Sequence, residues 1–398
     1  MGLIKILHTA DLHLGAGSTV GGKKRVEDFL SSFKRITEIA LREEVDILLI
    51  AGDIFHTPRP SSNIFYSFAE LTKRLFEKGV RIVAAAGNHD VPKSAEERSL
   101  IEALAEYSEG RFLFFKKPGV ATITVKGGKT VAVVALPYLN PIQFILPDRV
   151  EESRYRRIVR EKVAKLLEEI DADYRILLGH LMMEWATFGS EKIFVGERDI
   201  RVSSSDIFSH KFDYVALGHV HKPQSRDNMF YAGSIERIDF SEAKESKRVV
   251  LLEEENGSLT PKELRIPVRS MLNEVILLDD TSKISHEVYR ILSKINTIKD
   301  PNEIMPPVLR LKLVINRRAS INIKKIENLL RNKVYLVKII VQYIQQNKSN
   351  IVLDKREKPL REIIKMYIKK ICEYSLDLKD LEEDLIREAL NIIDEVST

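Results

Sequence analysis

The chain has 398 residues, of which 44% are hydrophobic and 30% are charged, so a packed core and two to three domains are expected. Its single cysteine excludes a disulfide scaffold and is typical of a reducing compartment. A net charge of +5 does not by itself indicate a nucleic-acid partner. We expect neither secretion nor a membrane span, because the sequence has no signal-peptide core and no run of about 20 apolar residues.

Apolar strand-like runs alternate with helical periodicity through the first two thirds of the chain. The spacing of apolar residues predicts three helices, Val26–Glu43, Ser61–Phe76 and Arg149–Ile170. A hairpin is expected next, with the strands Arg248–Glu254 and Leu259–Ile266 joined by a turn at Asn256-Gly257. This order of elements predicts two packed sheets with flanking helices.

Five short polar motifs follow apolar runs along the chain. They are Asp11-Leu12-His13, Gly52-Asp53, Gly87-Asn88-His89-Asp90, Gly179-His180 and Gly218-His219-Val220-His221. In an open α/β sheet, ligands collect where strands end and the chain turns. Carboxylates, an amide oxygen and imidazoles suit two divalent ions such as Mn²⁺. The motifs therefore predict a metal centre with seven candidate ligands, Asp11, His13, Asp53, Asn88, His180, His219 and His221.

Each motif taken alone has an ordinary structural explanation. A lone histidine in a strand is usually a hydrogen-bonded core residue, and a lone Gly-Asp is usually a turn. Six of the nine histidines, however, lie in or next to the five motifs. This ordered set favours the metal centre, and structural roles are expected for the remaining histidines, His8, His210 and His286.

The ordered set resembles the calcineurin-like metallophosphoesterases. His56, three residues after Asp53, and the segment Tyr231–Phe240 narrow the resemblance to the nuclease subunit called SbcD in bacteria and meiotic recombination eleven in archaea and eukaryotes. The resemblance is specific over residues 3–255 and looser beyond them. It implies an α/β fold in which a two-sheet metallophosphoesterase sandwich with flanking helices precedes a small α/β capping domain and a C-terminal helical segment.

The same resemblance implies a role for each motif residue. Asp53 would bridge two Mn²⁺ ions, with Mg²⁺ as the alternative metal. The first ion would also be bound by Asp11, His13 and His221, and the second by Asn88, His180 and His219. His89 is expected to contact the phosphate and protonate the leaving oxygen, and Asp90 to orient His89. His56 is expected to contribute to exonuclease action.

The implied activity is Mn-dependent cleavage of DNA at double-strand breaks, as a 3′-to-5′ exonuclease on duplexes and an endonuclease on single strands. The implied partners are DNA, an SbcC-type SMC-like coiled-coil ABC ATPase and a second copy of the chain. One alternative is another dinuclear metallophosphoesterase, such as a nucleotide phosphodiesterase or phosphatase. His56, the segment Gly233–Asp239 and the basic capping domain argue against it. The other alternative is a non-enzymatic DNA-tethering scaffold, against which the complete ligand set argues.

These expectations place the protein in the cytoplasm of a prokaryote, associated with the nucleoid. The Lys-rich and Glu-rich composition is compatible with a thermophile.

A change in composition predicts a small α/β domain over residues 269–344, after a larger first domain over residues 1–268. The resemblance implies that the first is the nuclease domain and the second a capping domain that contacts DNA. Its expected elements are a strand Leu272–Leu278, a helix Ser285–Ile295, a strand Val308–Ile315, a helix Ile321–Leu330 and a strand Val334–Tyr343. Between Arg310 and Lys333, eight basic residues stand against one acid. This stretch is either a solvated charged face or a phosphate-contacting surface, for which the candidate residues are Arg317, Arg318, Lys324 and Lys325.

The composition changes again after residue 344, where residues 345–358 predict a polar linker and residues 359–398 a helical segment. Seven basic and two acidic residues lie between Lys355 and Lys370, followed by nine acidic and two basic ones between Glu373 and Glu395. These charges predict an antiparallel pair of helices, which is too small to bury its own apolar faces. The pair packs either on this chain's own body or, as the resemblance implies, on the ATPase, with the candidate contacts Leu378, Leu381, Leu385 and Ile392.

Overall fold

The computed structural model describes residues 3–17, 23–91, 98–140, 152–188, 200–278, 281–316, 321–344, 361–362, 364–365, 368–369 and 382–396. Its contacts divide the chain into two compact units, Met1–Ile344 and Gln345–Thr398. The proposed nuclease and capping domains both belong to the first unit, so the division between them at residue 268 stays a proposal. Within the described residues, no helix is long and apolar enough to cross a membrane.

The first sheet has six strands in the order β12-β11-β1-β2-β3-β4. Its strands are β1 (Lys5–Thr9), β2 (Ile47–Ala51), β3 (Arg81–Ala85), β4 (Phe112–Phe115), β11 (Arg248–Glu255) and β12 (Ser258–Arg265). Strands β1 to β4 are parallel, whereas β11 and β12 form the predicted antiparallel hairpin. Asn256 and Gly257 both have positive φ, as the tight turn between hairpin strands requires.

The second sheet also has six strands, in the order β5-β6-β7-β8-β10-β9. They are β5 (Gly119–Thr124), β6 (Thr130–Leu136), β7 (Tyr174–His180), β8 (Tyr214–Gly218), β9 (Gln224–Arg226) and β10 (Met229–Tyr231). Strands β6, β7 and β8 are parallel. The two sheets pack face to face through a core that includes Ile6, Leu49, Val133 and Ile176.

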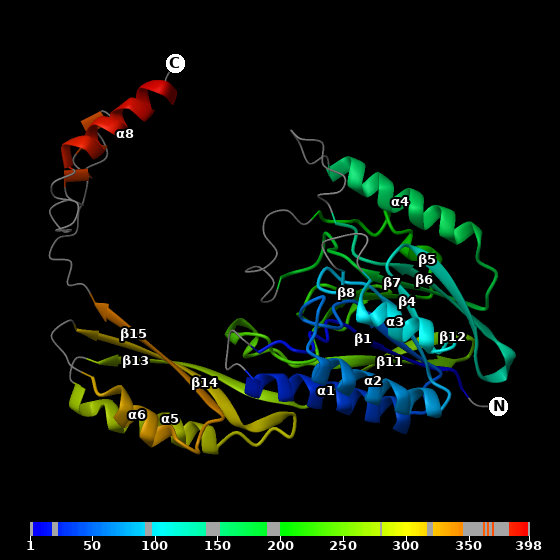
Figure 1. Cartoon of the computed structure of the whole chain (residues 1–398), viewed down its shortest axis with the longest axis horizontal. Coiled ribbons are helices and arrows are strands. Elements are labelled where there is room, and N and C mark those ends of the chain that lie inside the picture. The colour runs from blue at the N-terminus through cyan, green and yellow to red at the C-terminus, as the bar shows by residue number, and fades with distance from the viewer. Residues whose placement is uncertain are drawn as a thin grey trace. The chain divides into compact units, whose positions relative to one another are not determined.

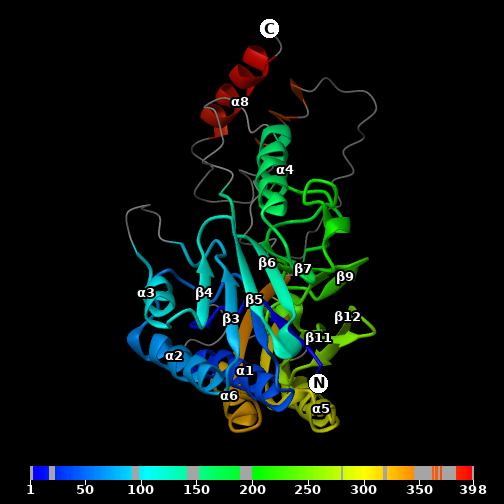
Figure 2. The same cartoon turned by 90° about the vertical axis from the view of Figure 1, so that its right-hand side faces the viewer.

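Helices cover the outer faces of both sheets, α1 to α3 on one side and α4 on the other (Figure 1, Figure 2). Their bounds are Lys23–Arg42 for α1, Ser62–Glu77 for α2, Leu100–Tyr107 for α3 and Glu152–Glu168 for α4. Phe33 and Phe68, from α1 and α2, stack at 5.3 Å beneath the first sheet. Because both faces of each sheet are covered, β2 is buried at every residue, as in parallel sheets generally. The predicted two-sheet sandwich with flanking helices is confirmed.

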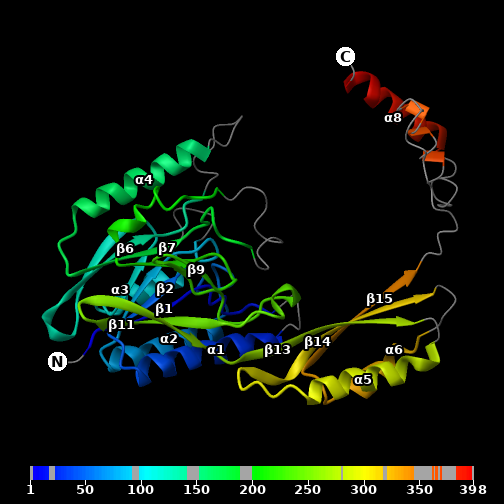
Figure 3. The ribbon, with the colours of Figure 1, turned by 180° about the vertical axis from the view of Figure 1, so that it is seen from behind.

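A third sheet of three parallel strands, β13-β14-β15, follows in the same unit. Its elements are β13 (Val268–Leu278), α5 (Ile284–Asn296), β14 (Glu303–Asn316), α6 (Ile323–Leu330) and β15 (Leu336–Ile344). This is the predicted order, but β13 begins four residues before the predicted strand. Both helices cover one face of the sheet (Figure 3), where Val288 and Ile326 pack against Leu311. The opposite face carries no helix from the described part of this unit.

In the second unit, helix α8 spans Glu382–Val396. The predicted linker, residues 345–358, and the candidate contacts Leu378 and Leu381 lie outside the described residues.

Candidate dinuclear metal centre

The seven candidate ligands lie at one edge of the sandwich, His180 as the last residue of β7 and the others in the loops after β1, β2, β3 and β8. The carboxyl ends of parallel strands lie at the same edge of a sheet, so side chains that are distant in sequence can meet there. Two glycines allow the close approach. A Cβ on Gly218 would lie 1.8 Å from the carbonyl oxygen of Ala51, and one on Gly52 would lie 2.1 Å from Nδ1 of His180.

The first group of candidate ligands consists of Asp11, His13 and His221, which are all buried. Nε2 of His13 lies 3.0 Å from Nε2 of His221 and 3.5 Å from Oδ2 of Asp53. Two imidazole nitrogens and a carboxylate oxygen thus point at a common position. That arrangement is the one a divalent cation would need.

The second group surrounds Nε2 of His180, which lies 3.1 Å from Oδ1 of Asn88 and 3.3 Å from Nδ1 of His219. Oδ2 of Asp53 is 3.6 Å from the same nitrogen, so this carboxylate stands between both groups. Nδ1 of His180 faces the carbonyl oxygen of Ala51 at 2.8 Å. Because a carbonyl only accepts, Nδ1 carries the proton and Nε2 offers its lone pair to the centre.

The backbone at the centre is held in a conformation that most residues avoid. Asp11, His13, Asp53 and His219 all have positive φ, between 40° and 90°. Left-handed conformations of this kind cost on the order of 1–3 kcal/mol each and cluster at functional sites. The loops therefore maintain these four side-chain directions against local strain.

Burial strongly affects the pKa values of the candidate ligand side chains. It lowers the pKa of His180 to about 4 and that of His13 well below its usual value, so both rings are neutral at pH 7. Burial, and to a smaller extent Asp53, raises the pKa of Asp11 to about 7. Burial would also raise the pKa of Asp53, but the imidazoles around it, His180 foremost, outweigh this and lower it. Neutral imidazoles and buried carboxylates are the donors that divalent ions require, so the residues present fit two ions.

Two further histidines, His89 and His56, lie beside the candidate ligands. His89 is 28% exposed, and its Nε2 lies 4.0 Å from Oδ2 of Asp53. Its Nδ1 donates to the carbonyl oxygen of His56 at 2.9 Å, and the two rings stack at 5.5 Å. The rings of His13 and His89 meet edge to face at 4.9 Å. The two predicted catalytic histidines are therefore neighbours at the exposed side of the centre.

Asp90 does not have the role expected of it. Its Oδ1 accepts from the backbone nitrogens of Ile54 and Phe55 at 2.9 and 3.2 Å, and its Oδ2 accepts from that of Gly87 at 2.9 Å. The expectation that Asp90 orients His89 is wrong, because its oxygens face backbone N–H groups instead. This buried carboxylate ties the loop after β3 to the loop after β2.

Comparisons with known proteins place this geometry in a family. The family model described as calcineurin-like phosphoesterase matches residues 4–223. The D subunit of the nuclease SbcCD from Staphylococcus epidermidis is 30% identical over 327 residues, covering 78% of this chain and 83% of that protein. The chain belongs to the SbcD family of calcineurin-like phosphoesterases.

Two solved structures show weaker similarity. A dimetal phosphatase from Danio rerio is 10% identical, with a TM-score of 0.38. The match covers 66% of this chain and 96% of the phosphatase. A cold-active protein-tyrosine phosphatase from a psychrophilic Shewanella is 12% identical, with a TM-score of 0.29. The match covers 66% of this chain and 81% of that phosphatase. TM-scores this low support no argument.

Three residues of this SbcD-family centre were not predicted from the sequence. Glu242 lies behind His221 and pairs with buried Lys247, with Lys247 Nζ 2.6 Å from Glu242 Oε2. The ring of Tyr138 lies 5.8 Å from that of His219. Tyr138 follows β6, so its position at a strand end was the available signal. Glu242 and Lys247 lie in a polar stretch that gives no comparable signal.

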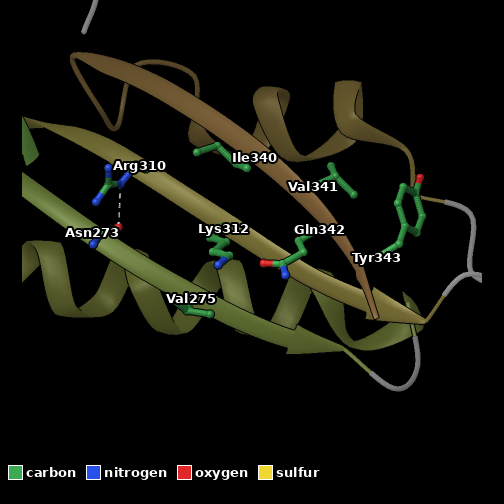
Figure 4. Close-up of a pocket in the computed structure, with 8 residues that line it drawn as sticks. All are labelled: Asn273, Val275, Arg310, Lys312, Ile340, Val341, Gln342 and Tyr343. Carbon is green, nitrogen blue, oxygen red and sulfur yellow. Dashed lines mark hydrogen bonds between the residues drawn. The ribbon is translucent and has the colours of Figure 1, made fainter. Parts of the chain in front are cut away.

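The predicted basic surface of this SbcD-family chain is divided between two faces. Lys324 and Lys325 are exposed on α6, whereas Arg317 and Arg318 lie outside the described residues. Arg310 and Lys312 instead line a pocket on the helix-free face of β13-β14-β15 (Figure 4). Their strand neighbours Leu309, Leu311 and Leu313 face the helices. The basic residues of β14 and α6 therefore cannot form one continuous patch.

Helix α8 exposes one predicted partner contact. Leu385 is 38% exposed, and acidic Glu383, Asp384 and Glu388 are exposed around it. Ile392 lies within the same helix.

Proposed function

We propose that this chain is a two-metal nuclease that hydrolyses phosphodiester bonds in DNA. The observation that carries the proposal is the convergence of six donor residues around a seventh, Asp53, with two further imidazoles at the exposed side. Membership of the SbcD family supports DNA as the substrate, since the relative from Staphylococcus epidermidis is named a nuclease.

The ligand assignment follows the two groups of donors. Asp53 would bridge two ions, for which Mn²⁺ is proposed and Mg²⁺ is the alternative. Asp11, His13 and His221 would hold one ion, and Asn88, His180 and His219 the other. When bound, the ions would stabilise the negative charge that develops on the phosphoryl oxygens.

His89 is proposed to supply the proton to the leaving oxygen while water adds its hydroxyl to phosphorus. Its Nδ1 proton is engaged by the carbonyl oxygen of His56, so the acid form would be the imidazolium, which carries its transferable proton on Nε2. That nitrogen is on the side of the ring nearer Asp53. Partial exposure leaves His89 accessible to a phosphate group. His56, stacked on the same ring, is proposed to guide the DNA end during exonuclease action.

A cleavage assay tests this function. Linear duplex DNA, labelled at either end, is incubated with the full chain and Mn²⁺ or Mg²⁺, and circular single-stranded DNA serves as the endonuclease substrate. Release of nucleotides from 3′ ends and nicking of the circle, both stronger with Mn²⁺, are expected. Hydrolysis of small phosphate esters without cleavage of either DNA would overturn the proposal in favour of another phosphoesterase.

The proposed partner is an SbcC-type coiled-coil ATPase, with a second copy of the chain completing the complex. Helix α8 supports this, because its exposed Leu385 offers an apolar contact of the kind used in helix-in-groove docking. Deleting residues 346–398 should leave metal binding and intrinsic cleavage intact while abolishing association with the ATPase. Leu381→Glu with Leu385→Glu should reproduce the deletion, since a buried unpaired charge opposes binding. If the truncated chain unfolds, the segment belongs to this chain's own core.

A further inference from the structure

A buried carboxylate stands behind the candidate ligand His221. Nδ1 of His221 lies 3.4 Å from Oε1 of Glu242, while Nε2, on the other side of the ring, faces Nε2 of His13 at 3.0 Å. Glu242 is fully buried and His221 nearly so. An ionised carboxylate only accepts hydrogen bonds, so Nδ1 carries the ring proton and Nε2 presents its lone pair to the centre.

The carboxylate is itself fixed by surrounding donors. Its Oε2 accepts from Nζ of Lys247 at 2.6 Å, from the backbone nitrogen of Ile238 at 3.2 Å and from Oγ of Ser234 at 3.3 Å. Nζ of Lys247 also donates to the backbone carbonyl oxygen of His221 at 3.1 Å. This small network therefore contacts both the ring and the backbone of His221.

The other imidazoles of the centre are supported differently. Nδ1 of His180 donates to the backbone carbonyl of Ala51, and Nδ1 of His13 has no hydrogen-bond partner within the described part of the chain. A carboxylate behind an imidazole increases the basicity of the opposite nitrogen and fixes the orientation of the ring. His221 should therefore be the strongest nitrogen donor of the first group.

We propose that Glu242, held by Lys247, is a positioning residue that keeps His221 in the tautomer and orientation needed to bind one of the two ions. This inference rests on the proposed function, which assigns His221 as a ligand. The alternative is that Glu242 only helps to neutralise Lys247, whose Nζ also lies 2.9 Å from Oε2 of Glu245, since a buried ammonium with too few partners destabilises a fold.

Four variants of the full chain separate these roles. Glu242→Gln removes the carboxylate charge, Lys247→Met removes the ammonium, and the double variant removes both buried charges together. Glu255→Gln, the same chemical change at an exposed end of β11, is the matched control. Each variant is titrated with Mn²⁺ by calorimetry and unfolded in urea, so that metal affinity and stability are measured independently of cleavage.

The wild-type chain and Glu255→Gln should bind two ions. Glu242→Gln should weaken one of them by ~10–100-fold, the usual effect of losing such a partner, and leave the other unchanged. The double variant should recover stability relative to Glu242→Gln but keep the weakened site. Lys247→Met should lose stability and retain more affinity than Glu242→Gln, because the carboxylate still faces His221.

Three results would overturn the role of Glu242. They are wild-type affinities in Glu242→Gln, recovery of affinity in the double variant, and a loss in Lys247→Met equal to that in Glu242→Gln. His221→Ala distinguishes this failure from failure of the proposed function, because it should remove one ion from the chain. If the wild type binds no Mn²⁺, or His221→Ala keeps both ions, the ligand assignment fails and the role of Glu242 fails with it.

Discussion

The metal centre and the three-stranded sheet both use parallel strands to present polar side chains, but at different positions on those strands. The candidate ligands lie at strand ends, and all but the exposed Asn88 are buried, with Asp11 and His180 fully so. The basic residues Arg310 and Lys312 lie half-buried along the middle of β14, on the face without helices and beside exposed apolar residues, of which Leu277 is 73% exposed. One region gathers its polar groups at a point, and the other spreads them over a surface.

This difference has a geometric cause. At the carboxyl ends of strands the chain turns, so loops from several strands can aim side chains at one position. Along the middle of a sheet, neighbouring strands are about 4.8 Å apart and side chains stand parallel to one another, so charges form rows. Strand ends therefore suit small ions, and strand surfaces suit extended partners.

Removing the carboxylate shared by both ligand groups should have the largest effect on metal binding and cleavage. Asp53→Ala should abolish binding of both ions and all cleavage, because Asp53 stands between both sets of imidazoles. Calorimetric titration with Mn²⁺ and the duplex assay measure these losses. Asp171→Ala, at an exposed position, is the control. Two intact high-affinity sites in Asp53→Ala would show that the centre does not depend on a shared ligand.

Changing His89 separates the chemistry from the metal scaffold. His89→Ala should keep both ions and lower the rate of cleavage by ~10²–10⁴-fold, the usual contribution of a general acid. Exposed His210→Ala should have no effect on either measurement. His56→Ala should impair cleavage of linear duplex more than nicking of circular single strands. Equal losses on both substrates would remove the proposed guidance of the DNA end by His56.

A single methyl group tests whether the strand ends must approach so closely. In Gly218→Ala the new Cβ would lie 1.8 Å from the backbone oxygen of Ala51, so the sheets must move apart. We expect a loss of about 3 kcal/mol or more in the free energy of unfolding. Gly110→Ala, at φ +76° with no neighbour within 4 Å, should cost only about 1–2 kcal/mol from backbone strain. Equal urea midpoints for the two variants would show that close approach is unimportant.

The strand-end motifs could be predicted from the sequence because each candidate ligand lies within a few residues of the end of an apolar run. Glu242 and Lys247 could not, since the stretch from Ser241 to Lys247 is polar and contains no apolar run that would predict burial. The fold instead buries both side chains, and only the contact with His221, 21 residues earlier, reveals their role. Tertiary contacts of this kind leave no local pattern.

The basic stretch shows a second limit of sequence analysis. Four of its basic residues lie close together in the chain, namely Arg310, Lys312, Lys324 and Lys325. Closeness in the chain does not place them on one face, because side chains alternate along β14 with a period of two residues. That period sends Arg310 and Lys312 to the face opposite α6, which packs over Leu311 through Ile326. The order of strands and helices in this domain was predicted because its apolar spacing is regular, but which charges share a face depends on how the helices cover the sheet.

The smallest expected effect concerns which basic face contacts DNA. Lys324→Ala with Lys325→Ala should reduce the slope of log affinity against log salt by about two units, because each lost phosphate contact removes roughly one. Both side chains are exposed at the start of α6, where helix N–H groups also favour phosphate. Binding of a nuclease-resistant duplex is measured at several salt concentrations.

Lys312→Ala with Lys338→Ala is the matched pair on the helix-free face, with the same charge removed. The slope of log affinity against log salt should change less for this variant. The exposed apolar side chains of Val275 and Ile340 lie beside these lysines, and an apolar side chain offers a DNA phosphate no favourable contact. A larger change for this pair than for the α6 pair would assign the DNA contact to the sheet surface. Unchanged slopes for both pairs would make both faces solvated surfaces and leave DNA binding to residues nearer the metal centre.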